Sequence, residues 1–233
     1  MPASAPRRLQ PRKAPVQSRS RVTVDAIFEA TVQVLLRHGM KGLTTKRVAE
    51  RAGVSVGTLY QYFPNKQALV YALNERYLSV LASRIEATCR AQAGAPLGQM
   101  VEALIETYWA AKTERADVTR ALYRSVAELD NDALVAAFAE RVDGVTAAMF
   151  ASASDKRLGD VARTNLSLAT VIYGTVRNAF ERGLPPREAD ELRADLVAMC
   201  RAYLAGLAGG QARTATTNRR GKRSSTRPST SGG

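Results

Sequence analysis

Hydrophobic residues recur at intervals of three and four along most of this 233-residue chain, which is the spacing of one face of an α-helix. The first such set lies between Val24 and His38 and comprises Ile27, Phe28, Thr31 and Leu35. From Gln67 to Gly210 the chain is rich in good helix formers, Ala, Leu, Arg and Glu, and no stretch alternates in the manner of a strand. The pattern therefore predicts an all-α protein of about nine helices.

Clusters of helix-breaking residues divide the long helical region. They lie at Gly94–Pro96, Asp130–Asp132, Ser152–Asp155 and Gly183–Pro186. Two of the intervening helices have clear apolar faces, the second of which Asn131 or Asp132 can cap. The faces comprise Leu97, Met100, Val101, Leu104, Ile105 and Tyr108 in one helix, and Leu134, Phe138, Val142, Val145 and Met149 in the other.

Before this region, residues 43–66 form two short helical patterns joined by a tight turn. Thr44 can cap the first helix, whose inner stripe comprises Val48, Ala49 and Ala52. Gly53 follows, where the helix must stop in a left-handed conformation that glycine adopts at little cost. We expect Val54 to be the buried residue of the turn.

The second short helix has an inner and an outer face. Ser55 can cap it, and Leu59 and Phe63 face inward at a spacing of four. Pro64 ends the helix and Asn65 can cap the next one. The outward residues are small or polar, so the helix can approach base edges in a major groove closely; they are Ser55, Val56, Gly57, Thr58 and Gln61.

The run Ala52 to Lys66, A-G-V-S-x-G-T-L-Y-x-Y-F-x-x-K, resembles the DNA-binding domain of the TetR family of transcriptional regulators. The resemblance is strongest from Arg21 to about Leu81. It implies a helix-turn-helix domain over residues 21–81 and a helical regulatory and dimerisation domain over 82–210. The composition of the remaining residues predicts disordered basic tails at 1–20 and 211–233.

The resemblance also implies roles for individual residues. Residues that donate to phosphates and fix the register are Thr45, Ser55, Tyr60, Tyr62 and Lys66. Residues that face the bases are Val56, Gly57, Thr58 and Gln61, with Lys46 as a further base reader from the preceding helix. The alternative is purely structural: both tyrosines could be partly buried aromatics, and Lys46, Arg47 and Arg51 could form a solvated face, which is the better interpretation of Arg51.

In the same family the C-terminal domain dimerises and senses a ligand. Its dimer interface would involve residues 160–182, with Ala169, Gly174 and Ala179 as small contacts, and residues 187–207, with Leu192, Leu196, Met199 and Tyr203. Candidate ligand-lining aromatics are Tyr108, Trp109, Tyr123, Phe138 and Tyr173, to which Phe150 and Phe180 can be added. Each of these aromatics could equally be an ordinary core residue.

The net charge of +13 is concentrated at the two ends of the chain. Residues 1–21 and 211–233 hold six basic residues each and no acid, so the part between them has 22 basic and 21 acidic residues. Tails of this composition do not bury enough apolar surface to fold. They favour an alternative function, an architectural DNA-binding protein with little sequence preference, although they could also be solvated segments with no DNA contact.

Other classes are disfavoured by what the composition lacks. The chain has one histidine, two isolated cysteines and no Cys-x-x-Cys, so neither a metal site nor a cofactor is predicted. Cys89 and Cys200 are expected in the core, with a redox sensor as the alternative. No apolar run is long enough for a membrane span or a secretion signal. We therefore predict a non-enzymatic, cytoplasmic, nucleoid-associated repressor, a homodimer that binds a palindromic operator in double-stranded DNA and is released by a small-molecule inducer.

Overall fold

The computed structural model describes residues 18–126, 131–155 and 157–220. Within these ranges the chain forms nine α-helices and no strand, which confirms the predicted all-α fold. The helices are α1 (Ser18–Gly42), α2 (Thr45–Ala52), α3 (Val56–Tyr62), α4 (Lys66–Ala91), α5 (Leu97–Thr113), α6 (Ala116–Val126), α7 (Asp132–Ala151), α8 (Val161–Arg182) and α9 (Pro186–Arg220).

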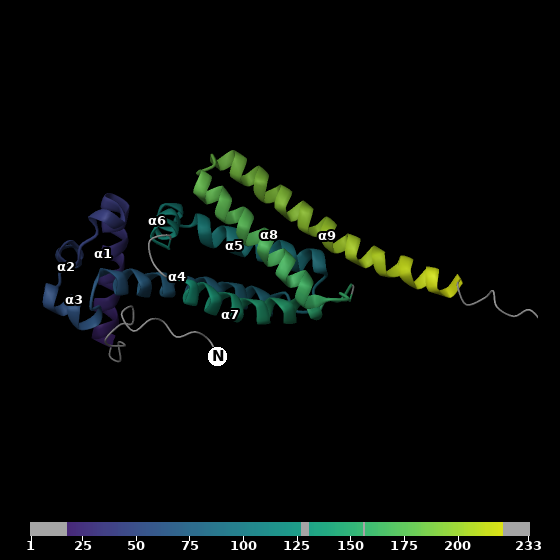
Figure 1. Ribbon diagram of the computed structural model, residues 1–233, viewed down its shortest axis with the longest axis horizontal. Helices are drawn as coiled ribbons and strands as arrows, with labels where there is room; N and C mark the ends of the chain where they lie inside the picture. The colour runs from purple at the N-terminus through teal and green to yellow at the C-terminus, as the bar shows by residue number, and fades with distance from the viewer. Residues whose placement is uncertain (1–17, 127–130, 156, 221–233) are drawn as a thin grey trace, which may run out of the picture.

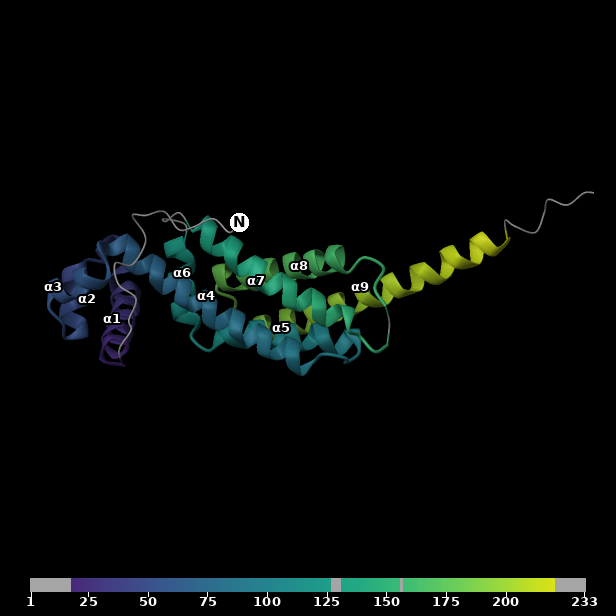
Figure 2. The same cartoon turned by 90° about the horizontal axis from the view of Figure 1, so that it is seen from below.

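The molecule is elongated and has two parts (Figure 1). Residues 18–73, which we call the head, comprise α1 to α3 and the first turns of α4 at one end of the molecule. Residues 74–207, which we call the body, comprise the rest of α4 and the remaining helices, of which α4, α5 and α7 run roughly along the long axis and α6 runs across it (Figure 1 and Figure 2). The view at right angles shows α4 and α7 side by side and the end of α9 extending beyond its neighbours (Figure 2).

Helix α1 contains the predicted helix but begins earlier, at Ser18. The break expected after His38 is present, because Gly39 has a φ of 62° and interrupts the helical geometry. The four apolar-face residues are buried, and Thr31 donates its hydroxyl to the carbonyl of Ile27 at 2.7 Å. This bond satisfies a polar group that would otherwise be costly inside the head.

The head has its own core, which α1 to α4 build around Ile27, Leu43, Val48 and Leu59, all fully buried. Val118 and Leu122 of α6 complete this core, although α6 lies more than forty residues further along the chain. The body therefore contributes to the interior of the head.

Helix α4 joins the two parts without a break. Its 26 residues span about 39 Å at 1.5 Å per residue. Leu69, Val70 and Leu73 pack in the head, whereas Leu81, Ile85 and Cys89 pack in the body. The domain boundary that we place at residue 81 thus lies inside a continuous helix.

Ion pairs connect helices of the body that are distant in sequence. Arg141 of α7 binds both carboxylate oxygens of Glu86 on α4, at 2.5 and 2.9 Å. Helix α9 is paired with α5 through Arg201 and Glu102 at 3.0 Å, and through Arg193 and Glu106.

The start of α5 uses a distant cap. Its N-cap residue is Pro96, which has no side chain able to accept a hydrogen bond. The carboxylate of Asp155, in the loop after α7, instead accepts from the N–H of Leu97 at 2.9 Å. A carboxylate at this position also interacts favourably with the positive end of the helix dipole.

The predicted breaks fall between helices wherever they lie in the described ranges, but the break between α5 and α6 was not predicted. Residues 114 and 115 include no glycine or proline, so the local sequence gives no stop signal. The turn is stabilised by Thr119, whose hydroxyl donates to the carbonyl of Lys112 at 3.0 Å. A hydrogen bond across the turn, rather than a helix breaker, thus accompanies this bend.

Both apolar faces predicted for the body are confirmed, since their residues are buried or half-buried. Cys89 and Cys200 are buried core residues, and burial raises the pKa of Cys89 to about 11. Helix α9 continues as far as Arg220, past Gly210 where we expected the tail to begin; no proline follows Pro186 until Pro228. Residues 1–17 and 221–233 of the predicted tails lie outside the described residues.

Candidate nucleic-acid interface

A left-handed glycine ends α2, as predicted. Gly53 has φ 68° and ψ 27°, and the N–H of Val54 donates to the carbonyl of Ala49 at 3.0 Å. A residue with a Cβ would be strained in this conformation. Val54 is only half-buried, contrary to our expectation, because it covers the head core from the edge of the turn.

Side-chain caps fix where α2, α3 and α4 begin. Thr44 accepts from the backbone N–H of Arg47 at 3.2 Å, and Ser55 from that of Thr58 at 2.9 Å. The third cap is Asn65, whose side-chain oxygen accepts from the N–H of Ala68 at 2.8 Å. All three caps were predicted from residue type and position, and they hold α3 in a fixed place on the surface.

Helix α3 has two opposite faces. Leu59 has no exposed surface, and Phe63, just after the helix, packs against Phe28 with ring centroids 5.6 Å apart. On the other face Val56 is 36% exposed and Tyr60 is 41% exposed. An apolar side chain left in solvent beside an otherwise polar surface suits contact with an apolar group on a partner, such as a thymine methyl.

Gly57 lies on the exposed face, in the first turn of α3. A Cβ placed there would contact only the Ser55 hydroxyl, at an ordinary 3.6 Å. The protein interior therefore does not require glycine at this position. The missing side chain instead lets an external surface come close to the helix backbone.

Hydroxyl groups link α2 to α3. The hydroxyls of Thr45 and Tyr60 lie 3.2 Å apart, and those of Ser55 and Thr58 lie 2.8 Å apart. The contact with Thr45 orients Tyr60 while leaving much of its side chain in solvent. A tyrosine held in this way is suited to donate to a phosphate.

The remaining predicted contacts differ in exposure. Lys46 and Gln61 are exposed, and Lys66 is half-buried in the first turn of α4. Tyr62 is half-buried and packs beside Phe63, with ring centroids 6.3 Å apart. The structural interpretation therefore fits Tyr62 better than Tyr60, and the DNA contacts of all these residues stay predictions.

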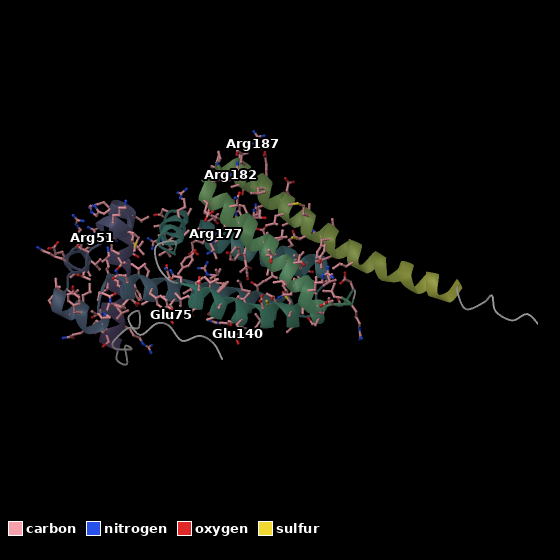
Figure 3. The ribbon with its side chains drawn as sticks, viewed as in Figure 1. Arg51, Glu75, Glu140, Arg177, Arg182 and Arg187 are labelled. Carbon is pink, nitrogen blue, oxygen red and sulfur yellow. The ribbon has the colours of Figure 1, made fainter. Side chains whose placement is uncertain are left out.

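Two arginines of α2 are engaged within the head. Arg47 donates to the carbonyl of Gly42 at 2.6 Å, at the end of α1, and Arg51 donates to the Gln33 side chain. Figure 3 shows Arg51 within the head, at the end of the molecule. These bonds agree with a solvated structural face for Arg51.

In the body, the aromatics predicted to line a ligand site all belong to the body core or pack against it, but their ring contacts form separate groups. Tyr108 and Phe138 contact Tyr173, with ring centroids 4.8 and 6.0 Å apart, whereas Trp109 contacts Phe180. The cavity beside Tyr108 and Tyr173 measures about 20 Å³, little more than one water molecule occupies. A ligand at this place would require the aromatic side chains to move.

Sequence reasoning missed Lys112, a fully buried cation among the same aromatics. Its Nζ lies 4.7 Å from the ring centroid of Tyr77, 5.3 Å from that of Tyr108 and 4.9 Å from that of Tyr123. Burial lowers the pKa of Lys112 to about 7. A signal was available, because Lys112 follows Tyr108 by four residues and so continues the apolar face of α5.

A larger cavity lies between the head and the body. This groove of about 270 Å³ has walls from α1, α4, α5 and α6, and Tyr77 is among its lining residues. Its apolar lining includes Phe28, Val32, Leu73, Val80, Ala111 and Val118.

Two family models match the chain. Residues 27–73 match the model described as "Bacterial regulatory proteins, tetR family", and residues 96–204 match the "Tetracyclin repressor-like, C-terminal domain". The first match covers most of the head and the second covers most of the body.

Curated relatives match part of the chain. The nucleoid occlusion factor SlmA of Haemophilus ducreyi is 36% identical over 107 residues, which are 46% of this chain and 52% of SlmA. The tetracycline repressor protein class C of Escherichia coli is 45% identical over 56 residues, 24% of this chain and 26% of that repressor. The chain thus spans about half the length, or less, of these relatives.

Solved structures share the fold over both parts of the molecule. One, from Mesorhizobium loti and ascribed to the TetR family, has a TM-score of 0.65 at 22% identity, covering 81% of this chain and 98% of that one. A TetR transcription regulator from Haloarcula marismortui has a TM-score of 0.60 at 22% identity, covering 77% and 97%.

Proposed function

We propose that this chain, which belongs to the TetR family of bacterial regulatory proteins and is a DNA-binding transcriptional regulator, acts as a repressor that a small-molecule ligand releases from its operator. The observation that carries the proposal is the exposed face of α3. That face presents Val56, Gly57, Tyr60 and Gln61 on a helix fixed by caps at its start and a buried leucine behind it. The arrangement fits a recognition helix in a major groove.

We assign different tasks to the exposed residues. Gln61 is placed to form a bidentate pair with adenine, and Val56 to contact a thymine methyl. Tyr60, Thr45 and Lys66 contact phosphates and hold the register without reading the sequence. The hydroxyl contact between Thr45 and Tyr60 supports this division, because it orients Tyr60 before DNA is bound.

The repressor acts as a homodimer through α8 and α9. Along α9, Met199, Tyr203 and Leu207 recur every four residues and are 52%, 38% and 37% exposed. Leu166 and Val171 of α8 are also exposed, at 63% and 45%. Exposed apolar residues concentrated on two helices suit an interface between identical subunits.

Part of our predicted interface is wrong, because Leu196 is fully buried and Ala179 is 5% exposed. On α9 the stripe of Leu196, Cys200 and Leu204 faces the core of its own subunit, and the neighbouring stripe faces outward. Two heads related by a two-fold axis would read half-sites about 34–36 Å apart, or a multiple of this distance.

Ligand release requires the body to change the position of the head. Helices α4 and α6 are suited to this role, since both have residues in the head core and residues in the body. A ligand shifts the equilibrium only by its difference in affinity between the DNA-binding and the released states.

A second candidate function is nucleoid association with weak sequence preference. It is supported by the basic ends of the chain and by the similarity to SlmA, whose name describes a nucleoid occlusion factor. In that case phosphate neutralisation by the tails supplies most of the affinity, and binding falls steeply with salt.

One selection experiment separates the two. Random duplex DNA is selected at near-physiological salt with the full chain and with a variant in which every Lys and Arg of residues 1–17 and 221–233 is replaced by Gln. We expect both proteins to select the same palindromic motif. If the full chain binds DNA without selecting a motif and the variant no longer binds, the second candidate is established and the repressor is rejected.

A further inference from the structure

Lys112 is a cation in a site that has no described acidic partner. It is 1% exposed, and no carboxylate of the described residues lies within ion-pairing distance of its Nζ. A buried ammonium without a counter-ion is unfavourable, and this explains the lowered pKa. The ammonium would be stabilised strongly by an anion placed beside it.

The groups that face Lys112 come from several helices. Tyr77 of α4, Tyr108 of α5 and Tyr123 of α6 surround it. From α8, Arg177 lies 5.8 Å from the ring centroid of Tyr123 and is paired with Glu181 at 2.7 Å. Burial is the largest influence on each tyrosine and raises its pKa, so all three are neutral at pH 7.

Tyr77 separates Lys112 from the groove between head and body. Its ring contacts Lys112 and also lines the groove. Its hydroxyl lies 2.9 Å from that of Thr119, which in turn donates to the backbone of Lys112. This contact holds Tyr77 in place. Because Tyr77 lies between the groove and Lys112, turning its side chain would break the contact and open a path from the groove to Lys112.

The rim of the groove does not itself favour a charge. Its three arginines are each paired with an acid, Arg76 with Asp25, Arg84 with Glu114 and Arg115 with Glu29. The floor is apolar, with Phe28, Val118 and Leu122 among its residues. Lys112, in contrast, contacts Tyr77, a residue of the groove wall, and has no described acid paired with it.

We propose that the effector of this protein is a small carboxylic acid, whose apolar part occupies the groove and whose carboxylate pairs with Lys112 after Tyr77 turns aside. A cationic ligand is disfavoured, since the tyrosine site already holds the ammonium of Lys112. The groove volume of about 270 Å³ is near the lower end of the range for ligand pockets, which indicates a compact acid.

Binding at this site would act directly on the head. Turning Tyr77 breaks its contact with Thr119 of α6, and the neighbouring Val118 and Leu122 of α6 are part of the head core. The effect of the acid on DNA binding rests on the proposed repressor function, whereas binding of the acid to the protein is measured without DNA.

The test compares 4-phenylbutyrate with 4-phenylbutanol, which have similar shape and differ in charge. Isothermal titration calorimetry of the full chain at pH 6.5 should give at least a tenfold lower Kd for the acid. This preference should shrink as the pH rises from 7 to 9, because the lysine must be protonated to pair. Equal binding of acid and alcohol, or binding of neither at millimolar concentration, rejects the proposal.

Two variants identify the residue responsible. Lys112→Met should retain the fold in a thermal melt and lose the preference for the acid. Arg84→Met, which alters a rim cation, should keep that preference. An acid preference that persists in Lys112→Met, or that is lost only in Arg84→Met, would overturn the assignment to Lys112.

A third measurement tests whether an acidic residue of this chain is paired with Lys112. Glu128 and Asp130 lie outside the described residues, so the pKa of Lys112 is followed by NMR of 13Cε-labelled lysine, with Lys112→Met giving the assignment. The proposal requires a pKa well below 10 in the free protein and a higher one with 4-phenylbutyrate. A pKa near 10 that falls in Glu128→Gln/Asp130→Asn would make an internal acid the partner. Failure of any of these tests leaves operator selection unaffected, so the two proposals fail separately.

Discussion

The head and the body consist of the same element, the α-helix, but different interactions fix it in place. In the head, the starts of α2 and α3 and the end of α2 are set by residues directly beside them, Thr44, Ser55 and Gly53. In the body, α5 is capped by Asp155, fifty-eight residues away, and the end of α5 is bound by Thr119. These helix ends of the head are set by local residues, whereas the start of α5 in the body depends on a distant segment of the chain.

This difference corresponds to what each part contacts. The head leaves Val56 and Tyr60 in solvent, which an external partner can cover. The body instead encloses its unusual group, Lys112, among its own tyrosines. The head thus presents its distinctive side chains to solvent, whereas the body encloses its own.

The largest effect tests the two faces of α3. Leu59→Ala should lower the free energy of unfolding by about 2–5 kcal/mol, because it creates a cavity in a fully buried site. Val56→Ala, on the exposed face, should change it by less than about 0.5 kcal/mol. Urea denaturation measures both, and similar losses in the two variants would contradict the division of α3 into a structural and a functional face.

The second effect concerns the pH dependence of the body. The pKa of Lys112 is about 7 in the folded protein and ordinarily 10.5, so between these values the unfolded chain holds a proton that the folded chain lacks. Stability should therefore rise with pH across this range, by up to about 1.4 kcal/mol per pH unit.

Urea midpoints of the wild-type chain and Lys112→Met at pH 7, 8 and 9 measure this slope. Above pH 10 the tyrosines with raised pKa values oppose it, since they ionise more easily in the unfolded chain. Parallel pH profiles for the two proteins would show that Lys112 retains its charge in the folded state.

The third effect separates two neighbours on the exposed face of α3. Gln61→Ala should change the preference at one base pair of each half-site by about 1–3 kcal/mol if its contact is bidentate. Tyr60→Phe removes only a hydroxyl, and should weaken binding to all sequences by a similar factor. Binding arrays of single-base operator variants distinguish these patterns, and a uniform loss for Gln61→Ala would reverse our assignment.

The smallest effect tests the ion pairs of the body. Arg141→Ala removes the contact between α7 and α4, but Arg141 is 39% exposed and its partner is accessible to solvent. We expect a loss of about 0–1 kcal/mol, smaller still in 0.5 M NaCl. A loss above 3 kcal/mol would mean that long-range ion pairs, and not the apolar core, hold the body together.

The same contrast explains what the sequence could predict. The caps at Thr44, Ser55 and Asn65 follow from residue types within one turn, so the helix-turn-helix was predictable in detail. The turn between α5 and α6 contains no glycine or proline, so no local signal predicts its position. Leu196 and Met199 are three residues apart on the same helix, α9. Which of them faces the core is determined only by how α9 packs against α5 and α8.

The candidate sites differ in the same way. The exposed residues of α3 could be named because their neighbours in sequence fix the helix orientation. The spacing of Lys112 from Tyr108 places it on the apolar face of α5, but its tyrosine surroundings could not be predicted, because they come from helices up to forty-six residues apart, at Tyr77 and Tyr123. Family resemblance supplied the remaining assignments, and the roles of the individual DNA-facing residues stay predictions.

The presence of Val118 and Leu122 in the core of the head has a consequence for protein engineering. A chimaera that joins residues 18–73 to the body of another regulator would lack two of the side chains that fill its interior. The DNA sequence specificity that we propose for this protein is therefore not expected to be transferred with residues 18–73 alone. A functional exchange would have to transplant α6 together with α1 to α4, so recombination within this fold is constrained by a helix far outside the DNA-binding segment.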